Sequence, residues 1–320
     1  MNSYYYHKIL ACLFACISLC CFQFCGDNEN TVNDQPPVAD PDTSHVVIET
    51  DTAFLPGVPQ GLIENEDLSE ASGLVVSRSN PDLIWSHNDS GDQTRLFLMG
   101  SKGDDRGVFK LTGIKNRDWE DIAISPGPEE GKTYIYIGDI GDNAAQYREK
   151  TIYRMIEPDV SSVDEKITGE ITGIETIKFE FPDGIRDAET LMLDPPSKDL
   201  YIISKRESKV GIYLLEYPYS TTESNLLKKV GAMNLSNVVG GDISAKGNEV
   251  LIKTYSAIYY WEKKGDEDIV SLLQTEPVRL PYFREPQGEA IGWKVDGSGF
   301  YTVSEEPQGI EANLFFYMRL

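Results

Sequence analysis

Residues 118–143, DWEDIAISPGPEEGKTYIYIGDIGDN, contain the pattern on which the fold prediction rests. The segment begins with acidic residues and a short apolar run, DWEDIAI (118–124), and continues with an aromatic and β-branched run, YIYI (134–137). It ends in GDIGDN (138–143), whose Gly, Asp and Asn residues are those that tight turns select for their backbone conformations. Its carboxylate and amide oxygens also suit a cation. Taken alone, this ending leaves two alternatives open, an acidic turn and half of a metal site.

The same order of features returns five times along the chain. Each copy has an acidic residue before a short apolar strand, then an aromatic strand with a polar ending, then a third strand. The five starts are LSEASGLVV (68–76), DWEDIAI (118–124), DAETLML (187–193), GGDISA (240–245) and QGEAIGW (287–293). The acidic residues Glu70, Glu120, Glu189, Asp242 and Glu289 are separated by 50, 69, 53 and 47 positions. Periods of this size with several short strands each are typical of a β-propeller.

The sequence therefore predicts an all-β fold, a β-propeller of four-stranded blades with five visible repeats. GVFKLTG (107–113) and TIKFEF (176–181) are predicted fourth strands of the first two copies. The fifth copy shows three strands, and we expect HVVIET (45–50) to supply its fourth and close the ring. A sixth blade built from the divergent segments 46–68 and 159–181 is the alternative.

The N-terminal segment is predicted to be an export signal, because one lysine precedes ILACLFACISLCCFQF, a predominantly apolar run of 16 residues. All five cysteines lie at positions 12–25, so the rest of the chain has neither disulfides nor thiolate-bound zinc. The junction of Cys25 with the acidic, Pro-rich GDNENTVNDQPPVADPD resembles a bacterial lipoprotein signal, in which the cysteine is lipidated. We expect 1–25 to be a lipoprotein-type signal, 26–45 a flexible tether and 46–320 one propeller domain. Ordinary cleavage and an uncleaved anchor remain alternatives.

The charge of the chain limits its partners. Lys and Arg total 29 against 52 Asp and Glu, giving a formal net charge of -23, which repels phosphate backbones and anionic lipid heads. We expect no nucleic-acid partner, and membrane contact through the lipid anchor only. A cation and a small-molecule, glycan or protein ligand remain as partners, and the expected location is the bacterial cell envelope, or the medium if the protein is secreted without an anchor.

Propeller geometry predicts where the polar residues meet. In an antiparallel blade, the start of the first strand and the end of the second lie at the same edge. If the first strand is innermost, the acidic residues and the polar strand endings surround one mouth of the channel. The predicted ligand-binding residues of this mouth are Glu70, Glu120, Glu189, Lys205, Asp242, Lys253 and Glu289. Carboxylates gathered in this way repel one another, so protons, basic side chains or a metal ion must neutralise them.

The first two copies lack a basic residue in their polar endings, HNDSGD (87–92) and GDIGDN (138–143). Calcium binds six to eight oxygens, so these endings are the predicted Ca²⁺ site. The predicted metal ligands are Asn88, Asp89, Asp139, Asp142 and Asn143. The alternative is that these side chains cap turns, and that acidic residues at strand starts bind backbone N–H groups between blades.

The combination of DWEDIA, YIYIGDIGDN, DAETL, LYIISK, QGEAIG and FYTVSE resembles a family of secreted or surface bacterial proteins that are predicted propellers of unassigned activity. The resemblance covers roughly residues 65–310 and implies the fold and export, but no reaction. The architecture is more loosely similar to the calcium-containing propeller hydrolases, the lactonases and phytases, whose ion lies at the channel mouth. That likeness rests on fold and acidic loops alone.

Two main hypotheses of function follow. The first is a lipid-anchored propeller that binds a ligand, with Ca²⁺, at an acidic channel mouth. The second is a metal-dependent hydrolase of a lactone, ester or phosphoester, in which His87 or Asp139 moves the proton. A purely structural role in an assembly is a third alternative. No serine lies in a nucleophile elbow, so a catalytic triad is not expected.

Overall fold

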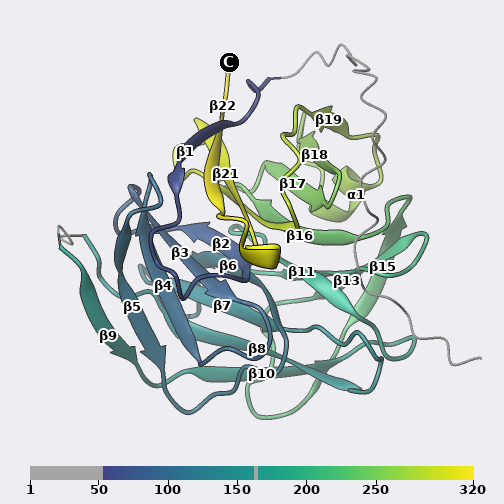
Figure 1. Ribbon diagram of the computed structural model, residues 1–320. Helices are drawn as coiled ribbons and strands as arrows, with labels where there is room; N and C mark the ends of the chain where they lie inside the picture. Colours follow the sequence, from purple (N-terminus) through teal and green to yellow (C-terminus); the bar gives the residue numbers. More distant parts are fainter. Residues whose placement is uncertain (1–52, 162–164) are drawn as a thin grey trace, which may run out of the picture. The chain divides into compact units, whose positions relative to one another are not determined.

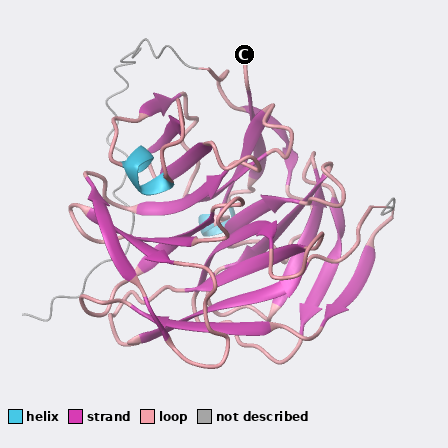
Figure 2. Ribbon diagram, turned by 180° about the vertical axis from the view of Figure 1, so that it is seen from behind, coloured by secondary structure: helices cyan, strands magenta, loops and turns pink. Residues whose placement is uncertain are grey.

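The computed structural model describes residues 53–161 and 165–320, which form five sheets around a common axis (Figures 1 and 2). The first sheet contains β2 (Ala71–Val76), β3 (Leu83–Asn88), β4 (Arg95–Gly100) and β5 (Asp105–Leu111). The second contains β6 (Trp119–Pro126), β7 (Thr133–Asp139), β8 (Glu149–Ile156) and β10 (Glu175–Glu180). The third contains β11 (Ala188–Leu193), β12 (Leu200–Ser204), β13 (Val210–Leu215) and β15 (Lys228–Met233). The fourth contains β16 (Val238–Ile243), β17 (Glu249–Thr254), β18 (Ala257–Glu262) and β19 (Val278–Leu280). The fifth contains β20 (Gly288–Trp293), β21 (Gly299–Ser304), β22 (Asn313–Met318) and β1 (Val58–Leu62).

The sheets are the blades of a β-propeller, because their first strands close a ring. β2 contacts β6, β6 contacts β11, β11 contacts β16, β16 contacts β20, and β20 contacts β2 again. Each of these five strands is buried along its length, except for Pro126 at the end of β6, as expected for the innermost strand of a blade. Helix is limited in the described chain to α1 (Ile269–Leu273) and a 3₁₀ turn at Pro307–Gly309, and no helix there is long and apolar enough to span a bilayer.

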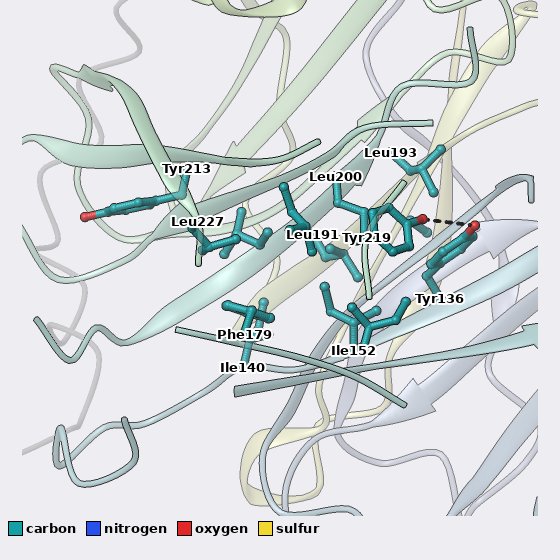
Figure 3. Packing of buried hydrophobic residues seen from close by; sticks show 14 of the residues in the cluster. Tyr136, Ile140, Ile152, Phe179, Leu191, Leu193, Leu200, Tyr213, Tyr219 and Leu227 are labelled. Atoms are coloured by element: carbon teal, nitrogen blue, oxygen red, sulfur yellow. Dashed lines mark hydrogen bonds between the residues drawn. The ribbon is translucent and has the colours of Figure 1, made fainter. Parts of the chain in front are cut away.

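The core is divided among the blade interfaces. The described residues form five buried apolar clusters, and each joins two neighbouring blades. Between the second and third blades, Tyr136 and Ile152 pack with Leu191 and Leu200 (Figure 3). Inner strands covered on both faces read as continuous apolar runs, such as LYIIS in β12, whereas the outer β5 and β10 alternate buried with more exposed residues.

An N-terminal strand closes the ring, but it is not HVVIET (45–50), which lies outside the described residues. β1 pairs antiparallel with β22, so the strand that completes the fifth blade comes from 58–62. Before it, Phe54 forms a bridge with Arg319 and packs in a buried aromatic group against Tyr260, Trp293 and Phe300, with ring centroids 5.3–5.8 Å apart. The prediction that an N-terminal strand completes the fifth blade is confirmed, but the strand is 58–62 and not 45–50.

The segments proposed for a sixth blade belong to other sheets. β9 (Ile167–Ile171) adds to β5 as a parallel outer strand of the first blade. β10 is the fourth strand of the second blade, and the short β14 (Asn225–Leu226) extends it in parallel. The described chain therefore has five blades, and β5 and β10 confirm the fourth strands predicted at 107–113 and 176–181. The predicted signal (1–25), the tether (26–45) and Cys25 lie outside the described residues.

Replacement of Phe54 by alanine tests the closure. Phe54 is 1% exposed, and loss of a buried phenylalanine typically costs about 3–5 kcal/mol. We expect Phe54→Ala to lower the free energy of unfolding by this amount in urea denaturation. Val58→Ala, on the exposed face of β1, is the matched control and should change it by less than about 0.5 kcal/mol. Equal effects of the two changes would contradict closure through Phe54.

Candidate functional site: an acidic channel mouth

All five blades carry the same irregularity where the innermost strand begins. The register with the second strand shifts by one residue in each blade, and the extra residues are Ser72, Glu120, Glu189, Val239 and Glu289. Such β-bulges leave a residue unpaired and redirect its side chain. The residues two positions earlier are Glu70, Asp118, Asp187, Asn237 and Gln287. On the second strand of each blade, one residue pairs with the residue just before the bulge. The residues that directly follow this partner are Asp89, Ile140, Lys205, Tyr255 and Glu305.

We call the residues at these three positions the mouth. Backbone hydrogen bonds join the positions within a blade, for example from Asp89 N to Glu70 O and from Lys205 N to Asp187 O. Carboxylates occupy both the bulge and the position two residues earlier in the second and third blades alone, as Asp118-Trp119-Glu120 and Asp187-Ala188-Glu189. Each of these two blades therefore places two carboxylates at the start of its innermost strand.

Two groups of carboxylates have ligand atoms within 4.8 Å of one another. One contains Asp89, Asp118 and Glu120, and the other contains Glu120, Asp187 and Glu189. Oxygens bound to one Ca²⁺ lie up to about 5 Å apart, twice the usual metal–oxygen distance. These acidic groups could therefore hold a metal ion, and Glu120 belongs to both.

Glu120 is the central carboxylate of the mouth. It is 4% exposed, and no donor in the described part of the chain forms a hydrogen bond with either of its oxygens. Burial and then the nearby Glu189 carboxylate raise the pKa of Glu120 well above its ordinary value. Glu189 is 3% exposed, and its Oε2 has no hydrogen-bond partner among the described residues. Burial raises the pKa of Glu189 as well, although Lys205 opposes this effect. Buried carboxylates with no donors are costly unless a proton or a cation neutralises them.

Basic groups neutralise only part of this charge. Lys205 forms an ion pair with Glu189, and its Nζ lies 3.0 Å from the Tyr255 hydroxyl. That hydroxyl donates to Glu289 Oε1 at 2.7 Å. Arg206 Nε donates to Asp187 Oδ2 at 2.6 Å. Lys205 and Arg206 thus each form an ion pair with one carboxylate at the edge of the group.

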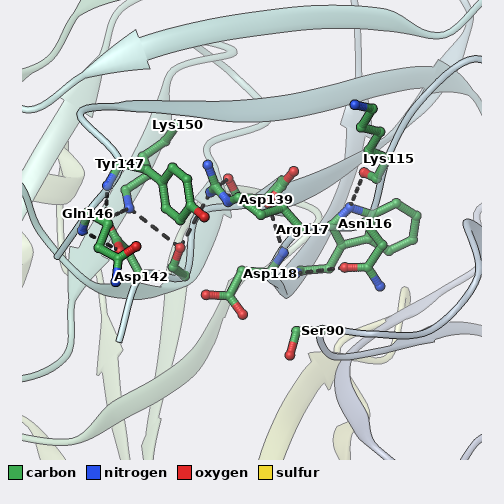
Figure 4. A network of polar contacts seen from close by, with 12 residues as sticks. Ser90, Lys115, Asn116, Arg117, Asp118, Asp139, Asp142, Gln146, Tyr147 and Lys150 are labelled. Carbon is green, nitrogen blue, oxygen red and sulfur yellow. Dashed lines mark hydrogen bonds and ion pairs between the residues drawn. The ribbon is translucent and has the colours of Figure 1, made fainter. Parts of the chain in front are cut away.

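The segment GDIGDN is mainly structural (Figure 4). Asp139 Oδ1 accepts from Asp118 N at 3.0 Å and lies 3.2 Å from Arg117 Nη2. Asp142 accepts from the backbone N–H groups of two following residues and from Lys150 Nζ, each at 2.7 Å. Asn143 accepts from Arg206. These three predicted metal ligands already have protein donors and lie outside both carboxylate groups, so the turn reading fits them better.

The first-blade metal candidates differ from each other. Asn88 Oδ1 accepts from Glu70 N at 3.0 Å, just as Asp139 Oδ1 accepts from Asp118 N. Asn88 Nδ2 donates to Asp67 O and to Asp92. Its amide is therefore occupied. Asp89 is partly exposed and belongs to the first carboxylate group, and burial followed by Glu289 raises its pKa to about 7. Among the five predicted metal ligands, Asp89 alone belongs to a carboxylate group.

The structure brings some of the predicted ligand-binding residues together at the mouth and places others elsewhere. Glu120, Glu189 and Glu289 share the bulge position, Lys205 lies beside them, and Glu70 is exposed two residues before the bulge of its blade. Asp242 does not share that position. It lies three residues beyond the bulge and accepts from Trp293 N of the next blade at 2.8 Å. Asp121 accepts from Leu191 N in the same way at 2.9 Å, so these two carboxylates join blades.

Lys253 and His87 occupy equivalent places on the second strands, and both are fully buried. Lys253 donates to Gly288 O and lies 3.6 Å from the buried Glu285 carboxylate. The His87 ring packs edge-on against Trp119, and burial lowers its pKa to about 4. Neither side chain is accessible to a ligand in the mouth, so the structure does not favour His87 as the group that moves a proton.

Asp118 was missed as a candidate ligand, although a signal for it exists. The motif D-x-E occurs at two strand starts, where it begins with Asp118 and with Asp187. In Figure 4 the Asp118 carboxylate points away from the hydrogen-bonded network around Asp139 and Asp142. Tyr255 was also missed, because its place in the mouth depends on where the bulges lie.

Comparison with known proteins yields no family model and no curated protein that matches this chain. Solved propeller structures match at low identity. The β-propeller domain of Cps50 (Swd1) from Myceliophteria thermophila is 11% identical, with a TM-score of 0.39, over 77% of this chain and 83% of that one. A nidogen/laminin complex chain is 12% identical, with a TM-score of 0.41, over 73% and 72%. A chain of Kuenenia stuttgartiensis hydrazine synthase is 11% identical, with a TM-score of 0.38, over 78% and 71%. Likenesses this distant say nothing of what the chain binds.

The mouth predicts an unusual pH dependence of stability. Burial and then Glu289 raise the pKa of Glu305 from 4.5 to about 9, so the folded protein keeps a proton that the unfolded chain releases. Stability contributed by this group is therefore lost as pH rises from about 4.5 to about 9. We expect the free energy of unfolding, measured in urea with a chelator present, to fall across this range. Glu305→Gln should make the fall shallower, and Glu130→Gln, an exposed position at the other end of the second blade, should not. An unchanged slope in Glu305→Gln would show that Glu305 titrates normally.

Proposed function

We propose that the protein is an exported, lipid-anchored propeller that binds a ligand through Ca²⁺ held at its acidic mouth. The observation that carries the proposal is Glu120, a buried carboxylate without a hydrogen-bond donor, set among four other carboxylates. A divalent cation at this place would replace the missing donors and remove the mutual repulsion. The Oε2 atom of Glu189, buried and unpartnered, points to the same need.

The chemistry of the donors favours calcium. Both carboxylate groups offer oxygen only, which is typical of sites for hard cations and unlike the His and Cys sites of zinc. Each group supplies three carboxylates, whereas Ca²⁺ binds six to eight oxygens. The remaining positions are free for water or for oxygens of a ligand, so a bound cation would connect the ligand to the protein. We expect carboxylate, hydroxyl or carbonyl oxygens on that ligand.

Export and anchoring rest on the sequence. The apolar run before Cys25 and the acidic, Pro-rich stretch after it are the reasons to expect a lipid-anchored protein of the cell envelope. The absence of cysteine after residue 25 agrees with a fold that needs neither disulfides nor thiolates. A tether of about twenty residues would leave the propeller free to meet its ligand away from the membrane surface.

Hydrolysis is the second candidate, and Asp89 is the residue that favours it. Asp89 is partly exposed and belongs to the same carboxylate group as Glu120, so it is placed to accept a proton from a substrate bound there. A cation at that group would polarise a substrate carbonyl or phosphoryl oxygen beside it. Asp139, the other predicted catalytic residue besides His87, is already paired with Arg117.

The binding proposal is tested by the effect of Ca²⁺ on stability. A ligand at one hundred times its Kd stabilises the native state by about 2.7 kcal/mol, so Ca²⁺ should raise the free energy of unfolding of the wild type. Glu120→Gln should lose most of this gain, because the change removes a charged ligand and keeps the shape. Without Ca²⁺ the variant should be at least as stable as the wild type, since it lacks a buried charge. Glu130→Gln should respond to Ca²⁺ as the wild type does. No stabilisation of the wild type at millimolar Ca²⁺ would contradict the proposal.

A substrate panel separates the second candidate from the first. If the mouth is catalytic, Ca²⁺-loaded protein should hydrolyse at least one lactone, ester or phosphoester. Asp89→Asn should reduce kcat by about 10²-fold or more while Ca²⁺ still binds to the other carboxylate group, Glu120, Asp187 and Glu189. Turnover that is equal in Asp89→Asn and wild type would exclude Asp89 as the base. Binding of Ca²⁺ without turnover on the whole panel would favour the ligand-binding function.

A further inference from the structure

We infer that the mouth holds two divalent cations, one in each carboxylate group, with Glu120 as the bridging ligand. This inference rests on the proposed function, because it concerns the number and arrangement of the ions at the same mouth. The two groups are Asp89 with Asp118 and Asp187 with Glu189, and Glu120 belongs to both.

Geometry argues against a single ion that is bound by all five carboxylates. Within each group the ligand atoms lie within 4.8 Å of one another, and the five residues do not form one common group. Asp89 and Asp118 come from the first blade and from the start of the second, whereas Asp187 and Glu189 belong to the third. An ion close to one pair is therefore not placed to bind the other pair as well. Glu120, on the strand between the two pairs, can offer one oxygen to each ion.

The bridging carboxylate is also one that lacks hydrogen-bond partners in the described part of the chain. Glu120 is 4% exposed, and its oxygens receive no hydrogen bond from the described residues. Glu189 is 3% exposed, and Lys205 pairs with its Oε1, which leaves the buried Oε2 without a partner. The second group thus keeps a free oxygen after its basic neighbour is satisfied. In the first group, the Asp118 carboxylate accepts no hydrogen bond from residues 53–161 and 165–320, although Asp118 N donates to Asp139.

The charge of the two carboxylate groups favours more than one divalent ion. Together the groups contain five carboxylates, Asp89, Asp118, Glu120, Asp187 and Glu189. Lys205 and Arg206 form ion pairs with two of them, Glu189 and Asp187. Three formal negative charges remain, which is more than one divalent cation neutralises.

The bulges explain why the pair forms at these blades. The bulge position brings Glu120 and Glu189 to the mouth, and the residue two positions earlier brings Asp118 and Asp187 beside them. Equivalent positions in the fourth blade hold Val239 and Asn237, which cannot supply charge. The fifth blade supplies Glu289, which the Tyr255 hydroxyl already binds. The second and third blades with Asp89 of the first are therefore where two adjacent sites are complete.

The number of bound ions tests the inference. We expect native mass spectrometry and calorimetric titration with Ca²⁺ alone, in 0.15 M salt, to find two ions per wild-type chain. Asp89→Asn should retain one ion, through the second group, and Glu189→Gln should retain one, through the first. Glu120→Gln should weaken both by about tenfold or more, because each ion loses a shared charged ligand. Glu130→Gln, which removes the same charge at the other end of the blade, should still bind two.

The outcomes distinguish failure of the inference from failure of the proposed function. One ion in the wild type, lost in Glu120→Gln, would overturn the pair and leave calcium-mediated binding intact. No ion in the wild type would overturn both. Two ions whose affinity is unchanged in Glu120→Gln would place them elsewhere and would also overturn both. Asp89 is partly exposed and accepts only from Ser90 N, so Asp89→Asn should fold even if a more buried change does not.

Discussion

Electrostatic repulsion among carboxylates that the backbone forces together is the constraint that shapes the mouth of this propeller. Side chains on separate blades converge because the innermost strands close a ring, and the chain has no freedom to separate them without opening it. Burial removes the water that would screen their charge, so each carboxylate raises the pKa of its neighbours. The structure tolerates this arrangement only if something outside the chain, a proton or a cation, completes it.

The rest of the fold supports that arrangement. Five apolar interfaces between blades hold the ring rigid, and Phe54 with β1 joins its two ends. Carboxylates with a different task join the inner strands directly, since Asp121 and Asp242 each accept a backbone N–H of the next blade. Acidic residues near the axis thus have two roles. Asp121 and Asp242 hold the blades together, and the carboxylate groups around Glu120 form the candidate site.

Sequence alone predicted the fold more completely than the site. Val, Ile, Tyr and Phe favour buried strands wherever they occur. The repeated order of strands could therefore be predicted from the residue types alone. The site depends on register. A bulge shifts which side chain reaches the mouth, and the shift cannot be read from composition, so Asp242 was aligned with Glu120 although it lies three residues beyond the equivalent position. The turn GDIGDN was ambiguous for a related reason. The sequence does not reveal that Lys150 forms an ion pair with Asp142, and this pair decides between a turn and a metal site.

Crystals grown with calcium, measured at a long X-ray wavelength where calcium scatters anomalously, would test the central claim most directly. The account predicts anomalous density at the channel mouth within about 2.6 Å of a Glu120 oxygen. Density maps without such a peak, in which protonated carboxyl groups share hydrogen bonds around Glu120 instead, would contradict it.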